Sequence, residues 1–138
     1  MSWPGQIPQG AVRDRLAISI DWMPTIAQYC DVPLPKGRID GESIVPIIDS
    51  AESASPHNVL HWETQGGKQW AVRADHWKLV YGGPATQDQG RRLPAAETFL
   101  SDMRQDVTET QNLAEQHPDV VERLTRLHAQ WVKDVKEQ

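Results

Sequence analysis

Cysteine is almost absent from this 138-residue chain, since Cys30 is the only one. A single cysteine excludes a disulfide within the chain and a zinc site built from several thiolates. Long apolar runs are lacking too. No segment approaches the roughly twenty apolar residues that a bilayer-spanning helix needs, and no basic start followed by an apolar run opens the chain. We therefore predict a soluble chain without a signal peptide or a membrane span, and its localisation stays open.

An excess of positive charge is also missing. The chain has 14 lysines and arginines against 19 aspartates and glutamates, a formal net charge of -5. The basic residues are scattered rather than arranged in a stripe, so the chain has no field that would attract a polyanion. We predict that neither nucleic acid nor a membrane is a partner.

The chain does contain large packing groups and many breaks. Six tryptophans supply the apolar bulk that disordered chains lack, and the length suits about one average domain. Ten prolines fall mainly at the joints between patterned segments, which predicts many short elements.

The first part of the chain is predicted to contain a short strand and a helix. Leu16, Ile18 and Ile20 alternate, which is typical of a strand. Asp21 is a suitable N-cap for a helix that ends near Cys30, with Pro24 in its first turn. A short helical turn follows, with Ser43 as its possible cap and apolar residues over 44–48, and residues 50–58 have the composition of a linker.

From Val59 the apolar pattern has a period of two. Strands are predicted at 59–63, 69–73 and 77–81, with a further strand at 97–100 and a loop over 82–93. A helix is predicted from Pro118 because apolar residues recur there at helical spacing: Val121, Leu124, Leu127, His128, Trp131, Val132 and Val135. The fold class is therefore α+β, an antiparallel sheet of about four strands with a long C-terminal helix packed on it, preceded by a short strand-helix segment.

The stretch from Ala71 to Gly83 gathers Arg73, Asp75, His76 and Lys78 around one tryptophan. It has two readings, a reactive cluster or a hairpin with its charges in water. Aspartate is one of the few residues besides glycine that accept the positive φ of a tight turn, so Asp75 is better explained by the turn than as a base. We favour the hairpin, in which Arg73 and Lys78 would at most reach toward a substrate anion.

A second candidate is a metal site. His57 and His61 are four positions apart and Glu63 follows, and on an extended strand all would share a face. Two imidazoles and a carboxylate can bind zinc or iron, although the signal is weak because Pro56 disturbs the start of the strand. His117 is expected to lead into the last helix, and His128 to be packed. The segment from Gly66 to Trp70 lacks the spacing of a phosphate-binding loop and is expected to form a hairpin turn.

Several segments, taken in order, resemble the C-terminal part of a type I sulfatase, of the arylsulfatase family within the alkaline-phosphatase-like superfamily. In the first part of the chain, the motif W-P-G-x-I resembles residues Trp3–Ile7, S-x-x-D-x-x-P-T resembles Ser19–Thr25, the segment after it resembles Val32–Pro35, and D-G-x-S-L-x-P-L-L resembles Asp40–Ile48. The terminal hairpins of the family resemble Trp62-Glu63, Ala71–Arg73 and Trp77–Val80. The tract L-Y-D-L-x-x-D-P-x-E-x-x-N-L is matched by Asp102, Asp106, Glu109, Asn112 and Leu113. Singly these motifs are modest, but their order is specific.

Four positions depart from the family pattern. Asp31 and Asp75 replace glycines, and both residue types tolerate the left-handed backbone region. Ser101 replaces a tyrosine and Val107 replaces a proline. The resemblance assigns residues 1–35 to the end of the sulfatase catalytic domain and residues 36–138 to the C-terminal subdomain.

The resemblance also implies what this chain lacks. Complete members of the family use a formylglycine, made from the first residue of C/S-x-P-x-R, and a calcium ion. Cys30 and Ser2 are each near a proline but neither begins this motif. We therefore expect no catalytic residue, no metal ligand and no cofactor in this chain, and a fragment that is inactive alone. The expected partner is a catalytic domain; the alternative is a free-standing binding or oligomerisation module that associates with itself.

Overall fold

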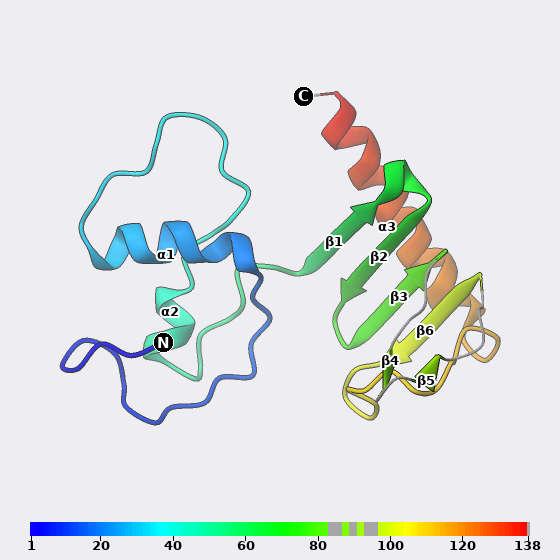
Figure 1. Cartoon of the computed structure of the whole chain (residues 1–138), viewed down its shortest axis with the longest axis horizontal. Helices are drawn as coiled ribbons and strands as arrows, with labels where there is room; N and C mark the ends of the chain where they lie inside the picture. Colours follow the sequence, from blue (N-terminus) through cyan, green and yellow to red (C-terminus); the bar gives the residue numbers. More distant parts are fainter. Residues whose placement is uncertain (83–86, 89–90, 93–96, 138) are drawn as a thin grey trace. The chain divides into compact units, whose positions relative to one another are not determined.

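The computed structural model describes residues 1–82, 87–88, 91–92 and 97–137, and the chain forms two compact units. Unit 1 is Met1–Asn58 and unit 2 is Val59–Gln138 (Figure 1). Unit 1 contains short helices and unit 2 a sheet with a long helix, so the predicted α+β class is confirmed. The boundary predicted after residue 35 concerns the domains of a complete sulfatase, and it stays a prediction.

Unit 1 contains the 3₁₀ turn η1 (Ser19–Asp21) and the helix α1 (Trp22–Tyr29). The strand predicted over 16–20 is wrong. The carboxylate of Asp21 accepts a hydrogen bond from the backbone N–H of Ile18, at 2.9 Å, and this bond closes η1 and occupies a donor that a strand would need for its ladder. The helix starts and ends as predicted, but the side chain of Asp21 does not cap it.

Left-handed backbone geometry follows α1. Asp31 has a φ of 52°, so it adopts the left-handed region that it was expected to tolerate at the end of the helix. The next helix, α2 (Val45–Asp49), begins at the N-cap Ile44 rather than at the predicted cap Ser43. Ile44 and Ile47 are buried in unit 1, and so is Pro24 of α1.

The segment predicted to be a linker, residues 50–58, has no helix or strand. It is nevertheless held in unit 1, because Ser55 Oγ donates a hydrogen bond to the carbonyl of Leu16 at 2.5 Å. Composition alone therefore identified the absence of regular structure but not the contacts that fix the segment.

Unit 2 contains a four-stranded antiparallel sheet, as predicted, and its strand order is β1-β2-β3-β6. Its strands are β1 (Val59–Thr64), β2 (Gln69–Ala74), β3 (Trp77–Tyr81) and β6 (Thr98–Asp102). The 3₁₀ turn η2 (Gln65–Gly67) joins β1 to β2, and Asp75, with a φ of 53°, makes the turn from β2 to β3. Both hairpin turns were predicted from the sequence.

The loop predicted over 82–93 is interrupted by a small second sheet. It consists of β4 (Gln87–Asp88) and β5 (Arg91–Arg92), which pair antiparallel. Strands of two residues carry no alternating pattern, so the period of the sequence could not predict them. The rest of that loop, beyond Gly82, lies outside the described residues.

The helix α3 (Pro118–Lys136) packs on β2 and β3, as predicted. Leu124 of α3 packs against side chains on one face of the sheet. The buried core of unit 2 consists of Val72, Ala74, Leu79, Leu100 and Leu124. His117 is the N-cap of α3 and His128 is buried, so both predictions for these histidines are confirmed. None of the helices in the described ranges has the length and apolar character to cross a bilayer.

Candidate functional site

The charged residues of the β2–β3 hairpin do not form a reactive cluster. Arg73 and Lys78 lie opposite each other in the ladder. The ammonium of Lys78 donates to Glu109 Oε1 at 2.5 Å, and the two side chains are only 24% and 10% exposed. Asp75 lies at the exposed turn, 3.4 Å from a guanidinium nitrogen of Arg123. The hairpin reading is therefore supported, and a role of Arg73 toward a substrate anion stays a prediction.

The Lys78–Glu109 pair links two of the family-like segments. Lys78 belongs to the hairpin and Glu109 to the tract that precedes α3, 31 positions further on. Glu109 is buried and has a φ of 55°, so the backbone bends where the carboxylate reaches the ammonium. An ion pair shielded from water in this way fixes the position of both segments, because separating the partners would leave a buried charge.

The tract before α3 is further held by its own side chains. Asp106 Oδ2 accepts hydrogen bonds from the backbone N–H groups of Thr110 and Gln111, at 2.6 and 2.8 Å. Asn112 accepts from the N–H of Leu100 and donates to the carbonyl of Thr98, both at 3.0 Å. The tract is thus attached to β6, although Ser101 and Val107 stand where the family pattern has tyrosine and proline.

In unit 1 several hydrogen bonds meet at the carboxylate of Asp21, and we call this group the Asp21 centre. It is fully buried and accepts hydrogen bonds from the backbone N–H groups of Ile18, at 2.9 Å, and Glu42, at 3.0 Å. His57 Nε2 lies 2.7 Å from Asp21 Oδ1, and because a carboxylate only accepts, the imidazole must donate. Burial alone would raise the pKa of Asp21, but the hydrogen bonds from Ile18, His57 and Glu42 together lower it below its usual value.

Two neighbours complete the Asp21 centre. Thr25 Oγ1 donates to the carbonyl of Asp21 at 2.6 Å and accepts from the N–H of Ile44 at 3.0 Å. Gly41 lies against the backbone of Ile20, where a Cβ would overlap the carbonyl oxygen. The segment similar to S-x-x-D-x-x-P-T and the segment similar to D-G-x-S are therefore in direct contact. The residue spacing within either segment alone does not predict this contact.

The structure does not support the alternative metal site at His57, His61 and Glu63. His57 precedes β1 and hydrogen-bonds to Asp21, so the rule that alternate strand residues share a face does not apply to it. His61 stacks on Trp131, with ring centroids 5.0 Å apart, and Glu63 lies 3.6 Å from His128. Within the ranges that the structure describes, no three His, Cys, Asp or Glu side chains are close enough to hold a metal ion.

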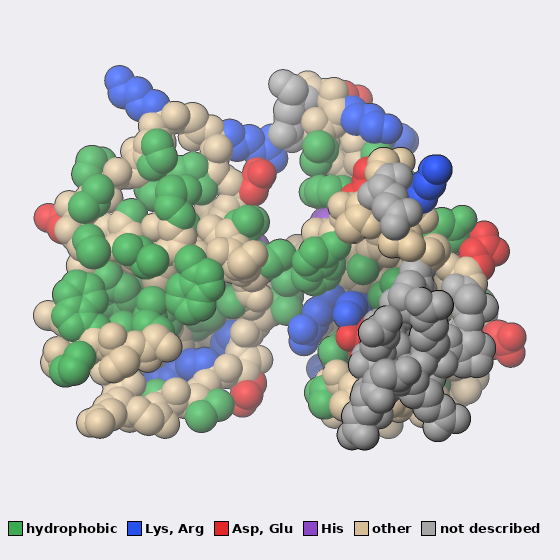
Figure 2. All heavy atoms as spheres, viewed as in Figure 1, with side chains coloured by type: hydrophobic (Ala, Val, Ile, Leu, Met, Phe, Trp, Pro, Cys, Tyr) green, Lys and Arg blue, Asp and Glu red, His purple; other side chains and the backbone are tan. Residues whose placement is uncertain are grey.

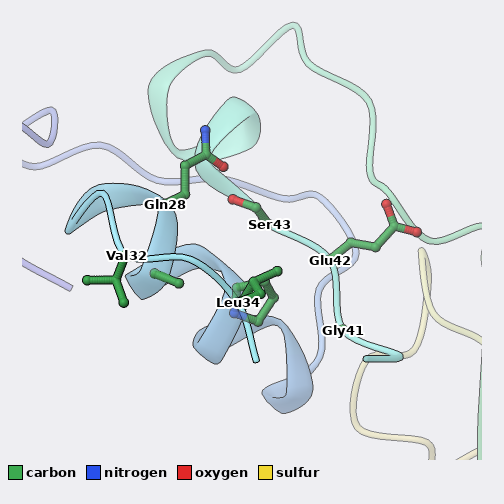
Figure 3. Close-up of a pocket in the computed structure, with 8 residues that line it drawn as sticks. Gln28, Val32, Leu34, Gly41, Glu42 and Ser43 are labelled. Carbon is green, nitrogen blue, oxygen red and sulfur yellow. The ribbon is translucent and has the colours of Figure 1, made fainter. Parts of the chain in front are cut away.

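A pocket of about 430 Å³ lies beside α1 (Figure 3). It is lined by α1, the segment after it and the segment that leads to α2: Pro24, Ala27, Gln28, Val32, Leu34, Gly41, Glu42 and Ser43. The lining combines apolar side chains with one carboxylate, one amide and one hydroxyl.

The solved structures that share this fold do so at low sequence identity. A protein solved in complex with its substrate D-glucosamine-2-N,6-O-disulfate matches 99% of this chain at 20% identity with a TM-score of 0.66, and 28% of that protein is covered. The phosphonate monoester hydrolase of Agrobacterium radiobacter matches 90% of this chain at 20% identity with a TM-score of 0.51, and 25% of it is covered. At these identities the similarity establishes the fold.

Curated relatives are sulfatases. Human arylsulfatase D is 33% identical over 94 residues, which are 64% of this chain and 16% of the enzyme. An uncharacterised sulfatase of Schizosaccharomyces pombe is 29% identical over 131 residues, 88% of this chain and 22% of that protein. The chain thus spans less than a quarter of the length of these relatives.

The fold and the order of the motifs define the C-terminal part of a sulfatase. The family model described as N-sulphoglucosamine sulphohydrolase, C-terminal, matches residues 1–137, and the chain belongs to this family.

Proposed function

We propose that this chain supports sulfate-ester cleavage as the C-terminal part of a sulfatase and does not catalyse it alone. The observation that carries the proposal is that neither Cys30 nor Ser2 begins a C/S-x-P-x-R motif. Cleaving a sulfate ester requires an activated nucleophile and cations that stabilise charge on the transferred group. A chain without a recognisable precursor of the nucleophile depends on another domain to supply it.

The residues present do not fit the cofactors of a complete family member. Cys30 is exposed at the C-cap of α1 and is followed by Asp31, Val32 and Pro33, so the proline comes one position late and no arginine follows. The described carboxylates also do not gather in a group that could hold a calcium ion. Both groups therefore belong, in this proposal, to the catalytic domain.

The purified chain, mixed with an aryl sulfate and calcium, is expected to give no turnover above the rate without protein. Release of the phenol, followed by absorbance, is the measurement, and a complete sulfatase is the positive control. The Cys30→Ala variant is the matched control. Turnover that survives repurification and disappears in this variant would show that Cys30 acts as a nucleophile, and the proposal would fail.

In this proposal, unit 1 has an exposed apolar surface that contacts the catalytic domain. Trp22, Met23 and Ile26 of α1 are 46, 45 and 53% exposed, and we call these three residues the α1 patch. Val32 and Leu34, which also line the pocket, are exposed as well, and Figure 2 shows hydrophobic side chains gathered over unit 1. Apolar side chains so concentrated favour contact with another protein surface.

The same patch favours the second candidate function, self-association as a binding module. If two copies bury the α1 patch against each other, the Ile26→Lys variant is expected to weaken the dimer at least about tenfold, because a charge would enter an apolar interface. Light scattering after gel filtration, at several protein concentrations, measures this. The Val107→Lys variant changes an exposed residue of unit 2 in the same way and is expected to leave association unchanged. A wild-type chain of 15.6 kDa that stays monomeric at every concentration counts against self-association.

A further inference from the structure

Two histidines lie in an aromatic cluster between α3 and the sheet of unit 2. His61 of β1 stacks on Trp131 of α3, with ring centroids 5.0 Å apart and an interplanar angle of 7°. His128 of α3 stacks on Trp70 of β2, at 4.3 Å and 12°. The two imidazoles are 6.0 Å apart. We call these four residues the imidazole cluster, and it joins the C-terminal half of α3 to β1 and β2.

The surroundings of the cluster favour the neutral form of both imidazoles. The Nδ1 atoms of His61 and His128 are buried and have no hydrogen-bond partner in the described part of the chain. A protonated imidazole has two N–H donors and a full charge, so protonation here would add a buried donor without a partner. Because both Nδ1 atoms are buried, water cannot easily accept from the added N–H, which increases that cost.

One carboxylate beside the cluster, that of Glu63, favours a protonated His128 and opposes the effect of burial. On β1, Glu63 Oε2 is 3.6 Å from His128 Nε2, beyond hydrogen-bond distance. On α3, Glu122 and Arg126 pair with each other at the exposed surface, Asp134 accepts from Gln130, and Arg123 lies near Asp75. The residues of β2 in register with this face, Trp70, Val72 and Ala74, carry no charge, and Tyr81 of β3 stacks on Trp70 and donates to Glu97.

The pKa shifts agree with this geometry. Burial, with a smaller contribution from the charge of His128, lowers the pKa of His61 to about 4. Burial also lowers the pKa of His128, while Glu63 acts in the opposite direction. Histidine in an unfolded or released segment has a pKa of about 6.5. A folded-state pKa below this value means that the contact is strongest above about pH 6.5 and weakens as the pH falls toward about 4.

We propose that the imidazole cluster is an acid-sensitive contact, through which proton uptake by His61 and His128 releases the C-terminal half of α3 from the sheet. The neutral rings hold the helix by stacking, and the charged rings repel each other and require water. The remainder of the core, around Leu124, has no titratable group and keeps unit 2 folded while the end of the helix separates.

Amide hydrogen exchange of the full chain at several pH values tests this proposal. After correction for the intrinsic pH dependence of exchange, protection of the α3 amides from His128 onward is expected to fall by about tenfold or more between about pH 7 and about pH 4.5. Protection in β2 and β3 is expected to change much less. Constant protection of the end of α3 over this range would overturn the proposal.

Phenylalanine substitutions separate the titration from the packing. The variant carrying His61→Phe and His128→Phe keeps two rings for stacking but cannot take up protons, so its α3 protection is expected to be independent of pH within about twofold. His117→Phe is the matched control, because His117 also contacts an indole, that of Trp77 at 4.9 Å, at the other end of α3. This variant is expected to retain the wild-type response.

A measurement on the wild-type chain keeps the proposal testable if the double variant does not fold. The imidazole protons of His61, followed by NMR during a pH titration, are expected to titrate well below 6.5 and together with the loss of α3 protection. A His61 that titrates at or above about 6.5, or a double variant that still loses protection in acid, contradicts the proposal.

Discussion

Replacing Leu124 by alanine is expected to lower the free energy of unfolding of unit 2 by about 2–5 kcal/mol. Leu124 is fully buried and packs with Val72, Ala74, Leu79 and Leu100, so the substitution removes apolar surface and leaves a cavity at the centre of the core. Amide exchange of Val72 and Ala74 in β2, which lie in this core, is expected to become at least about thirtyfold faster.

Val135→Ala is the matched control for Leu124→Ala. Val135 belongs to the same apolar stripe of α3 but is 47% exposed. Because its side chain remains largely in water, its truncation is expected to change stability by no more than about 0.5 kcal/mol. Equal effects at the two positions would mean that α3 does not pack on the sheet through Leu124.

Replacing Asp21 by asparagine is expected to destabilise unit 1 by about 3 kcal/mol or more. The carboxylate accepts from the N–H groups of Ile18 and Glu42 and from His57, whereas an amide has one oxygen and an NH₂ group. Asparagine would therefore place a donor against another donor in a fully buried site. Amide protection in α1 is expected to fall about a hundredfold, as measured by hydrogen exchange.

Asp40→Asn is the control for Asp21→Asn. Asp40 pairs with Arg38 at the exposed surface, and such pairs contribute little. The pH dependence gives a second check. Because the folded-state pKa of Asp21 is lowered, its contribution is present above the ordinary aspartate pKa and is lost as the pH falls through the lowered value. Unit 1 of the asparagine variant is expected to lack this acid transition.

The elements of unit 2 could be predicted because each buries one face. The alternation in β1, β2 and β3 and the helical spacing around Leu124 are local, so the sequence pattern contains them. The strand expected over 16–20 shows the limit of this reasoning. Three alternating apolar residues are too few to outweigh one carboxylate that captures a nearby N–H, as Asp21 does with Ile18.

The candidate sites were harder to predict because their contacts are distant in sequence. Asp21 was expected to cap a helix, and instead it accepts from Glu42 and His57, 21 and 36 positions away. Glu109 was identified only as part of a family-like tract, and the ion pair with Lys78 emerges from the fold. His61 and Glu63 were correctly placed on one strand face, but His57 lies outside the strand. Spacing predicts shared faces within an element, and it does not predict which elements meet.

The Lys78–Glu109 pair limits how hybrids with other sulfatases can be assembled. A hybrid that exchanges the segment from Met103 to Leu113 but keeps the resident β3 needs a carboxylate at position 109, because without it the half-shielded ammonium of Lys78 loses its partner. Crossovers between Asn58 and Val59 avoid this difficulty, because the hairpins, the tract and α3 are then inherited as a single block.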